Sequence, residues 1–470
     1  MNKILLYKSL ITGVLIVLIL IPLSLVGNLV QERRAYGQEA EQSIWKSYAG
    51  PQTLTGPVVV VPYKEVTSII ERADPKQPAV TTQRVEVRQL LVFPQALRVQ
   101  ASVTPGERYR GIHKTLVYEM QSRWEGSITL PTPDDLTRSP GHVRFEVGQP
   151  FVALGITDTR GVMSAPTLEL NGRKLALQQG AKLPTLSQGL HADLDLPAFK
   201  PAAGEPRTEA RTVAFALTLP LLGAQSLAVV PVAAQNDIAI DSPWPHPSFD
   251  GEFLPRARSV EATGFRANWS VTAFNTKARE QLSGAGGGGL DTVSVKLIEP
   301  VNIYLQTERA TKYGILFVLL TFAGFFLFEL IKQLRIHPVQ YLLVGLALAL
   351  FFLLLLSLSE HIAFALAYLA ASGACIGLLG FYLSFVLRSW KRGLGFAALL
   401  TTLYGALYVL LRSEDNALAL GSLLLFLLLA AIMVVTRKVD WYAAGAALQP
   451  QRDKPAATIV AGTGSEDATV

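Results

Sequence analysis

The chain has 470 residues, of which half are hydrophobic and only 17% are charged, and its formal net charge is +6. A typical soluble domain carries about 25% charged residues. This composition excludes a disordered chain and a purely soluble enzyme, and it predicts a membrane protein.

The first predicted element is a membrane-spanning helix. Residues 9–31 contain no Asp, Glu, Lys, Arg or His, and a spanning helix needs about 20 mostly apolar residues. The run is longer than the apolar part of a signal peptide and lacks a following Ala-x-Ala site, so we expect an uncleaved anchor. We assign residues 1–8 to a cytoplasmic N-terminus and residues 9–30 to the first transmembrane helix.

The segment after this span is predicted to be helical as well. Residues 31–48 contain no proline, and Gly50 and Pro51 follow them. The segment either continues the first helix or lies as a separate helix on the membrane surface. Trp45 and Tyr48 could anchor it at the membrane interface or cap a β core, and the sequence leaves both open.

Residues 31–310 are predicted to form a large periplasmic domain that is antiparallel, β-rich and sandwich-like. Runs rich in Val, Leu, Thr and aromatic residues recur between Pro and Gly residues. Asn171 and Gly172 separate two such runs and predict a hairpin. Strand periodicity places Val85 and Val87 on one face and the charged residues beside them on the other. The length permits one sandwich or two.

Five further transmembrane helices are predicted in the last third, which gives an α+β membrane protein with an N-terminal anchor helix and a C-terminal five-helix bundle. Residues 338–387 cannot be one helix, because that helix would be about 75 Å long against a hydrocarbon core of about 30 Å. The tail at 437–470 is predicted to be cytoplasmic and partly disordered. The predicted helices are 313–331, 339–358, 362–387, 393–411 and 416–436.

Lysine and arginine in the short loops predict the orientation. The loops at 332–337 and 388–392 are positively charged, whereas the loop at 360–361 has no Lys or Arg. We therefore expect both termini in the cytoplasm and residues 31–310 outside. That domain has 29 Lys and Arg against 28 Asp and Glu, so the positive excess reflects orientation in the bilayer, and we expect no nucleic-acid partner.

The sequence contains no phosphate-binding loop, nucleophile elbow or zinc-binding His-Glu-x-x-His helix. We therefore predict no catalytic residues, no metal site and no cofactor, and a protein that is not an enzyme. An enzyme acting on envelope polymers or lipids would require Asp158, Arg160 and His246 to meet in one cleft. The only cysteine, Cys375, is expected to be a small buried residue of a spanning helix.

Glu329 is the candidate intramembrane charge, and ionisable residues inside membranes often mark function. It could pair with Lys332 near the cytoplasmic face, since the two residues are three apart on one helix. It could also couple a proton or cation in a transporter or export component that uses the bundle. A transporter or export component that uses the helix bundle is therefore the alternative function of this protein.

The segment Trp244-Pro245-His246-Pro247-Ser248-Phe249 is predicted to be a rigid loop rather than a strand, because its two prolines fix the backbone and remove donors. The loop could plug one end of the sandwich. It could also present a preformed surface to a partner, because rigid aromatic groups bind with little loss of entropy. Trp244, His246 and Phe249 are the candidate partner-contact residues.

Several longer stretches are not generic membrane patterns. They are Gly50-Pro51-Gln52-x-Leu54-x-Gly56-Pro57, Asp158-x-Arg160-Gly161, residues 244–249, Arg309-Ala310-Thr311-Lys312-Tyr313, residues 337–346, Leu358-Ser359-Glu360-His361 and Asp440-Trp441-Tyr442. Together they resemble the CreD family of bacterial inner-membrane proteins over nearly the whole chain. The resemblance implies a role in cell envelope integrity and the envelope stress response, linked to colicin tolerance and β-lactam response. It implies no catalytic residue, and it leaves the mechanism, the periplasmic or envelope partner and the oligomeric state open.

Overall fold

The structure is a computed structural model that describes residues 3–71, 80–199, 210–284, 288–299, 303–332, 336–412 and 417–437. The chain divides into two compact units. Met1–Arg34 and Asn302–Val470 form the helical unit, and Ala35–Val301 form the β unit. Beyond Arg437, the predicted cytoplasmic tail lies outside the described residues.

The first helix, α1 (Lys3–Ser47), contributes residues to both units. It continues without a break from the predicted span through the segment that follows it, which is the first of the two alternatives left open by the sequence. The proline inside it, Pro22, does not end it.

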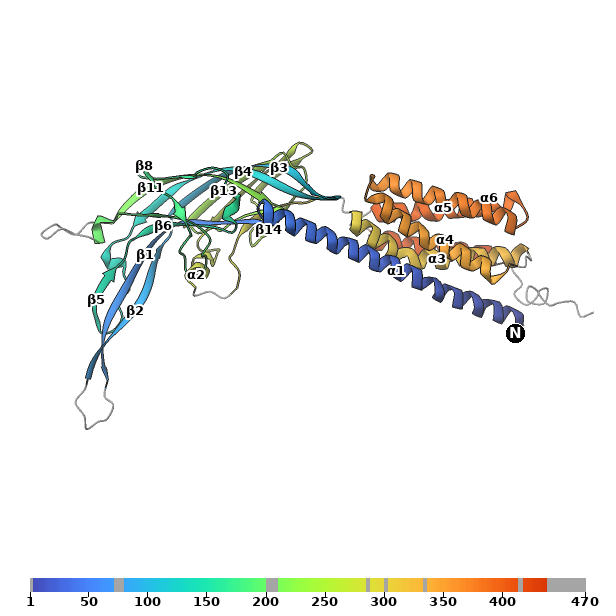
Figure 1. The fold of residues 1–470 in the computed structure, drawn as a ribbon, viewed down its shortest axis with the longest axis horizontal. Helices are drawn as coiled ribbons and strands as arrows, with labels where there is room; N and C mark the ends of the chain where they lie inside the picture. The colour runs from blue at the N-terminus through green and yellow to red at the C-terminus, as the bar shows by residue number, and fades with distance from the viewer. Residues whose placement is uncertain are drawn as a thin grey trace, which may run out of the picture. The chain divides into compact units, whose positions relative to one another are not determined.

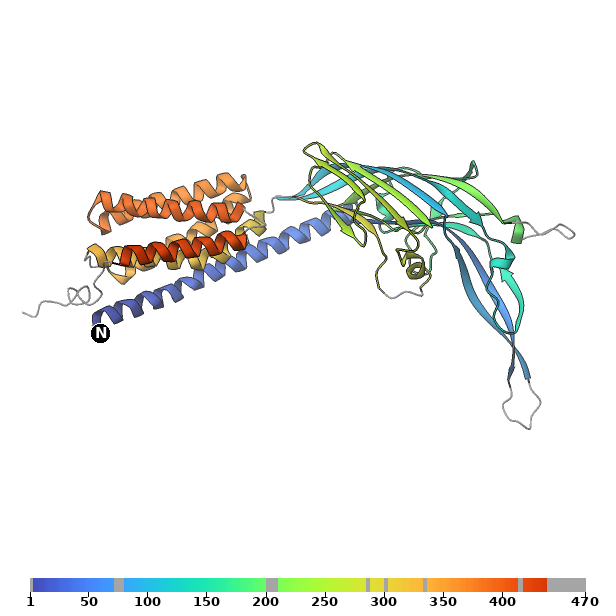
Figure 2. The ribbon, with the colours of Figure 1, turned by 180° about the vertical axis from the view of Figure 1, so that it is seen from behind.

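The helical unit contains long helices that run side by side in Figure 2. Each of the six predicted spans contains a long helix in the described part of the chain, and the helix in the span 362–387 begins at Phe364 and ends at Val386. In that part, five helices, α1 and α3 to α6, are long and apolar enough to cross a membrane. Besides α1, the helices of the unit are α3 (Ile303–Lys332), α4 (Pro338–Ser359), α5 (Phe364–Val386), α6 (Trp390–Arg412) and α7 (Ala417–Thr436).

Aromatic side chains fill the centre of the helical unit. Phe325 packs against Tyr341 and Phe396, with ring centroids 4.6 and 5.5 Å away. Cys375 is buried, and its Sγ accepts a hydrogen bond from the Tyr404 hydroxyl at 3.1 Å. The prediction of a small buried cysteine is therefore confirmed.

The first sheet of the β unit has nine strands among the described residues. The order is β14-β17-β12-β1-β6-β10-β9, and β2 and β5 also pair with β1. The strands are β1 (Gln52–Glu71), β2 (Val80–Val92), β5 (His142–Val147), β6 (Phe151–Ile156), β9 (Gln178–Gln179), β10 (Gly189–Asp193), β12 (Ser226–Val229), β14 (Pro247–Gly251) and β17 (Val293–Leu297).

The second sheet has eight strands in the described part, in the order β15-β16-β13-β3-β4-β11-β7-β8. The hairpin at Asn171 and Gly172 joins β7 to β8 as predicted, and both residues have the positive φ that such a turn requires. The strands are β3 (Ala96–Arg110), β4 (His113–Leu130), β7 (Thr167–Leu170), β8 (Arg173–Leu175), β11 (Arg211–Ala224), β13 (Gln235–Ser242), β15 (Ala257–Glu261) and β16 (Gly264–Thr272). The short helices are α2 (Ala278–Leu282), Pro133–Asp135, Thr159–Gly161 and Pro197–Phe199.

The two sheets share one hydrophobic core and therefore form a single sandwich. Val59 and Val61 of β1 belong to the same buried cluster as Val99 of β3 and Trp124 of β4. The predicted antiparallel arrangement is only partly right, because β1 pairs with β12 and β3 pairs with β13 in parallel. Parallel pairs join strands that are distant in the chain, and local alternation cannot reveal them.

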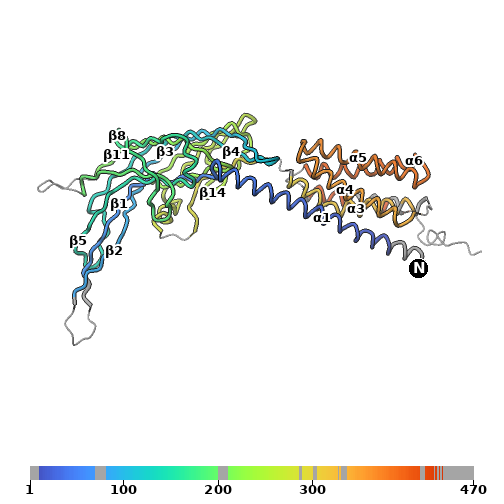
Figure 3. Tube along the Cα trace, in the orientation of Figure 1, coloured from blue at the N-terminus to red at the C-terminus, as the bar shows by residue number. Residues whose placement is uncertain are grey.

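Strands β1, β2 and β5 extend together as an arm (Figures 1 and 3). On β2 the valines and the charged residues alternate as predicted, but Val85 and Val87 are the exposed face, at 55% and 75%. The charged face points the other way because Arg88 forms an ion pair with Glu65, which is fully buried on β1.

Candidate functional site

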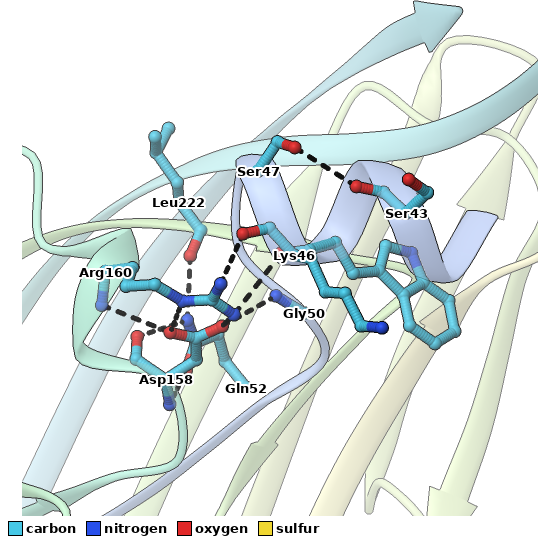
Figure 4. Close-up of polar contacts among 9 residues, drawn as sticks. Ser43, Lys46, Ser47, Gly50, Gln52, Asp158, Arg160 and Leu222 are labelled. Carbon is cyan, nitrogen blue, oxygen red and sulfur yellow. Dashed lines mark hydrogen bonds and ion pairs between the residues drawn. The ribbon is translucent and has the colours of Figure 1, made fainter. Parts of the chain in front are cut away.

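The last turn of α1 ends on the sandwich, and Arg160 satisfies its free carbonyl groups. The final carbonyls of a helix have no partner within the helix. The Arg160 guanidinium donates to the carbonyl oxygen of Lys46 through Nη1 and to that of Trp45 through Nη2, the latter at 3.4 Å (Figure 4). A positive charge at this end also complements the helix dipole.

Asp158 holds the guanidinium in place. Its two carboxylate oxygens accept hydrogen bonds from Arg160 Nε and Nη2 at 2.9 and 2.6 Å, a bidentate arrangement that fixes the plane of the guanidinium. Oδ2 also accepts the backbone N–H of Gly50 at 3.1 Å. Arg160 and the Gly50 amide lower the pKa of the Asp158 carboxyl, although partial burial opposes this shift.

Gln52 ties the same loop to two strands. Its buried amide donates through Nε2 to the carbonyl oxygens of Asp158 and Leu222, at 2.9 and 3.0 Å. Its Oε1 accepts the Asp158 N–H at 3.1 Å. Gly161 lies beside this amide, where an added Cβ would be 2.3 Å from the Leu222 carbonyl oxygen. We name Lys46, Gly50, Gln52, Asp158, Arg160 and Gly161 the helix joint.

Apolar contacts support the helix joint. Ile44 of α1 is buried with Val117 of β4 and Ala224 of β11. Trp45 and Tyr48 pack against this cluster, so both cap the sandwich, which was one of the two alternatives left open. The end of α1 is therefore held by packing as well as by hydrogen bonds.

The helix joint contains two of the three residues that an enzymatic site would require. Asp158 and Arg160 form an ion pair with each other, whereas the ring of His246 contacts Trp244 at 6.2 Å between centroids. Asp158 and Arg160 direct their polar atoms at backbone groups, which is the geometry of a structural clamp. Among the described residues, no group of three or more His, Cys, Asp or Glu side chains could hold a metal ion.

The segment 244–249 is partly a strand, so the prediction of a loop throughout is wrong. Pro247–Gly251 form β14, which pairs with β17 at the edge of the first sheet. Edge positions tolerate proline because its missing N–H is not needed by a neighbouring strand. The loop is therefore limited to residues 243–246, between β13 and β14.

The three candidate contact residues have different surroundings. Trp244 Nε1 donates to the Ile298 carbonyl oxygen at 3.0 Å. Phe249 packs edge-on against Phe265 and Trp269, each with centroids 5.8 Å away. Of these three side chains, only that of His246 is exposed to solvent. Trp244 and Phe249 thus contribute to the fold, and His246 is the residue that presents a free surface.

Glu329 is buried in the helical unit and is only 4% exposed. Its carboxylate accepts the Tyr341 hydroxyl at 2.9 Å and the backbone N–H of Ile336 at 3.3 Å. The side chain of Lys332, its predicted partner, lies outside the described side chains. The contacts of Glu329 join the end of α3 to the start of α4.

A second buried carboxylate, Glu65, was not predicted as a site. It accepts hydrogen bonds from the Ser139 N–H and hydroxyl at 2.6 and 2.8 Å and contacts His142 Nδ1 at 3.1 Å. Arg88 lies 3.0 Å away. The Ser139 amide is the main cause of the lowered pKa of Glu65. The sequence contains no clear signal for this site, because β1 also carries Lys64 and Glu71.

This architecture defines a class of protein: a membrane protein whose first helix is clamped to a β-sandwich and whose remaining helices form an apolar bundle. The family "Inner membrane protein CreD" matches residues 4–442. The chain is also 36% identical over 433 residues to the inner membrane protein CreD of Escherichia coli (strain K12), covering 91% of this chain and 92% of that protein. The chain therefore belongs to the CreD family of inner membrane proteins.

Proposed function

We propose that this protein maintains cell envelope integrity and takes part in the envelope stress response by non-enzymatic contacts of its β-sandwich with periplasmic or envelope partners. The helix joint is the observation that carries the proposal. Arg160 and Asp158 connect the end of α1 to the sandwich through backbone groups. A folded domain that grips the end of an anchor helix suits a protein that acts by contact.

The proposal places the sandwich in the periplasm and both termini in the cytoplasm. The Lys and Arg residues between the helices support this orientation, because positive loops stay on the cytoplasmic side. Arg388 follows α5, and Lys391 and Arg392 lie in the first turn of α6, whereas Glu360 and His361 follow α4. Links to colicin tolerance and β-lactam response extend the proposal and rest on the family resemblance.

Transport by the helix bundle is the second candidate, and burial of Glu329 is the observation that favours it. Buried ionisable groups in membranes mark proton and ion pathways in many transporters. The contacts of Glu329 with Tyr341 and the Ile336 N–H also satisfy a structural role, because they join successive helices. We therefore favour action through the sandwich.

Complementation distinguishes the two candidates. Cells that lack the gene would express the wild-type chain, His246→Ala or Glu329→Gln, and survival under a detergent that stresses the envelope would be measured. We expect His246→Ala to fail to complement and Glu329→Gln to complement at equal membrane abundance. Arg144→Gln, which changes an exposed ion pair on the arm, is the control. Failure of Glu329→Gln together with full activity of His246→Ala would favour transport.

A further inference from the structure

The outer face of the second sheet carries a groove that belongs neither to the helix joint nor to the segment 244–249. Its volume is about 360 Å³, and residues of β3, β13 and β16 together with Arg256 line it. Val99, Ile238 and Trp269 on these strands are buried in the core. Their neighbours along each strand therefore point to the outer face and into the groove.

A small residue creates the hollow. Ala239 on β13 lies in register between Gln100 on β3 and Asn268 on β16. Its side chain is a single methyl group, whereas both neighbours carry longer amide side chains. The outer face of the sheet therefore has a depression at Ala239, with the amide groups of Gln100 and Asn268 on either side of it.

Polar side chains without protein partners line this depression. In the described part of the chain, no hydrogen bond or ion pair engages the side chains of Arg98, Gln100, Asp237, Arg256 or Asn268. Some polar side chains elsewhere on the same sheet are paired: Arg123 Nε lies 2.6 Å from a Glu125 oxygen, and Ser102 donates to Asp241 at 3.0 Å. The groove thus combines two arginines, two amides and one carboxylate that are free to bind a ligand.

We propose that this groove binds a short peptide through its free carboxylate and its ammonium group. The guanidinium groups of Arg98 and Arg256 match the geometry of a carboxylate. Asp237, in register with Arg98, supplies an acceptor for the ammonium group, and Gln100 and Asn268 can bond to the peptide group. The volume lies at the lower end of the range for small-ligand pockets, about 300–1,000 Å³.

The charge balance selects this ligand over others. Two arginines and one aspartate leave one positive charge in excess, which attracts a carboxylate. Asp237 repels a compact anion such as inorganic phosphate, and it favours a ligand that also carries a positive group. The inference holds whether or not the segment at 244–249 contacts a partner.

Calorimetric titration of the full chain in detergent tests the proposal with alanyl-alanine as the probe. We expect the wild-type protein to bind the dipeptide and to bind its C-terminal amide about tenfold or more weakly, because the amide removes the charged acceptor. Inorganic phosphate should not bind. The N-acetyl dipeptide should bind more weakly than the dipeptide itself.

Three variants locate the site. Arg98→Gln should weaken dipeptide binding about tenfold or more, and Ala239→Leu should prevent it by filling the depression. Asp237→Asn should weaken binding of the dipeptide but not that of its N-acetyl form. Arg144→Gln lies on the arm and should bind like the wild type. Thermal unfolding of each variant verifies that it is folded. If Ala239→Leu does not fold, the binding measured for Arg98→Gln tests the proposal by itself.

Two results would overturn the proposal. One is absence of dipeptide binding by the wild-type protein at about 10 mM, a concentration that would detect even weak affinity. The other is unchanged binding by folded Arg98→Gln, which would place the ligand elsewhere.

Discussion

Arg160 donates a hydrogen bond to the backbone carbonyl of Lys46, 114 residues earlier in the chain. This contact links the last turn of α1 to the loop after β6. It places a guanidinium where the helix leaves carbonyl groups without partners. The last turn of α1 is therefore fixed to the sandwich by a defined set of hydrogen bonds.

Replacing Arg160 by Ala should loosen the end of α1. Its hydrogen bonds involve a charged group, and removing them should lower the free energy of unfolding of the sandwich. Limited proteolysis should then cut faster within residues 35–50. The proteolysis rate of Arg160→Lys should lie between the rates of the wild type and of Arg160→Ala. Lysine keeps the positive charge but lacks the planar guanidinium group that donates two parallel hydrogen bonds. Wild-type proteolysis rates in Arg160→Ala would contradict a clamping role.

Gly161→Ala should destabilise the same joint through steric conflict. The added methyl group would lie 2.3 Å from the Leu222 carbonyl oxygen and 2.7 Å from Gln52 Nε2. Overpacking of this kind typically costs about 1–3 kcal/mol. Gly106→Ala is the matched control, because its nearest contact would be an ordinary 3.8 Å. Equal thermal midpoints for the two variants would show that the loop can move aside.

Glu65 should make the stability of the β unit depend on pH in acid. Its pKa in the folded protein is lowered, chiefly by the Ser139 amide, from an unfolded value of about 4.3. Its contribution is therefore present above about pH 4 and is lost as the pH falls through the folded pKa. Thermal unfolding between about pH 2 and pH 6 should show a shallower pH dependence for Glu65→Gln than for the wild type.

The exposed Glu146 on the same arm provides the control for this measurement. Glu146→Gln removes one negative charge without touching the Ser139 contacts. If Glu65→Gln and Glu146→Gln had the same pH dependence, the buried carboxylate would not be the source of the effect.

Glu329→Gln should weaken the helical unit without a defect in ion movement. Glutamine can accept the Tyr341 hydroxyl, but its amide nitrogen cannot accept the Ile336 N–H. We expect a lower thermal midpoint of the purified protein. Wild-type proteoliposomes with a pH-sensitive dye should show no proton flux beyond that of protein-free vesicles. A flux in the wild type that Glu329→Gln abolishes would support the transporter alternative.

Much of the fold could be predicted from the sequence where the signal is local. Uncharged runs indicate spans because charges are costly in lipid, and each of the six runs contains a long helix in the described part of the chain. The turn at Asn171 and Gly172 was predictable because few residues adopt positive φ easily. The prolines at 245 and 247 misled the prediction, since edge strands accept proline.

The candidate site depends on distant contacts, which the sequence does not show. Gly50, Gln52, Asp158 and Arg160 all lie in stretches that suggested the family, but nothing in their spacing places them together. The faces of β2 were separated correctly, yet which face is exposed depends on Glu65 on the neighbouring strand. The pairing of a strand with its neighbours decides which of its faces is exposed, and sequence periodicity alone cannot predict this.

The central claim is that the sandwich acts by contact through its exposed surface near His246. The most direct measurement is photocrosslinking in living cells from an amino acid placed at position 246, compared with one placed at position 144 on the arm. We predict a discrete adduct with an envelope component from position 246 and none of that kind from position 144. No adduct from position 246, with specific adducts only from positions on α3 to α6, would contradict it.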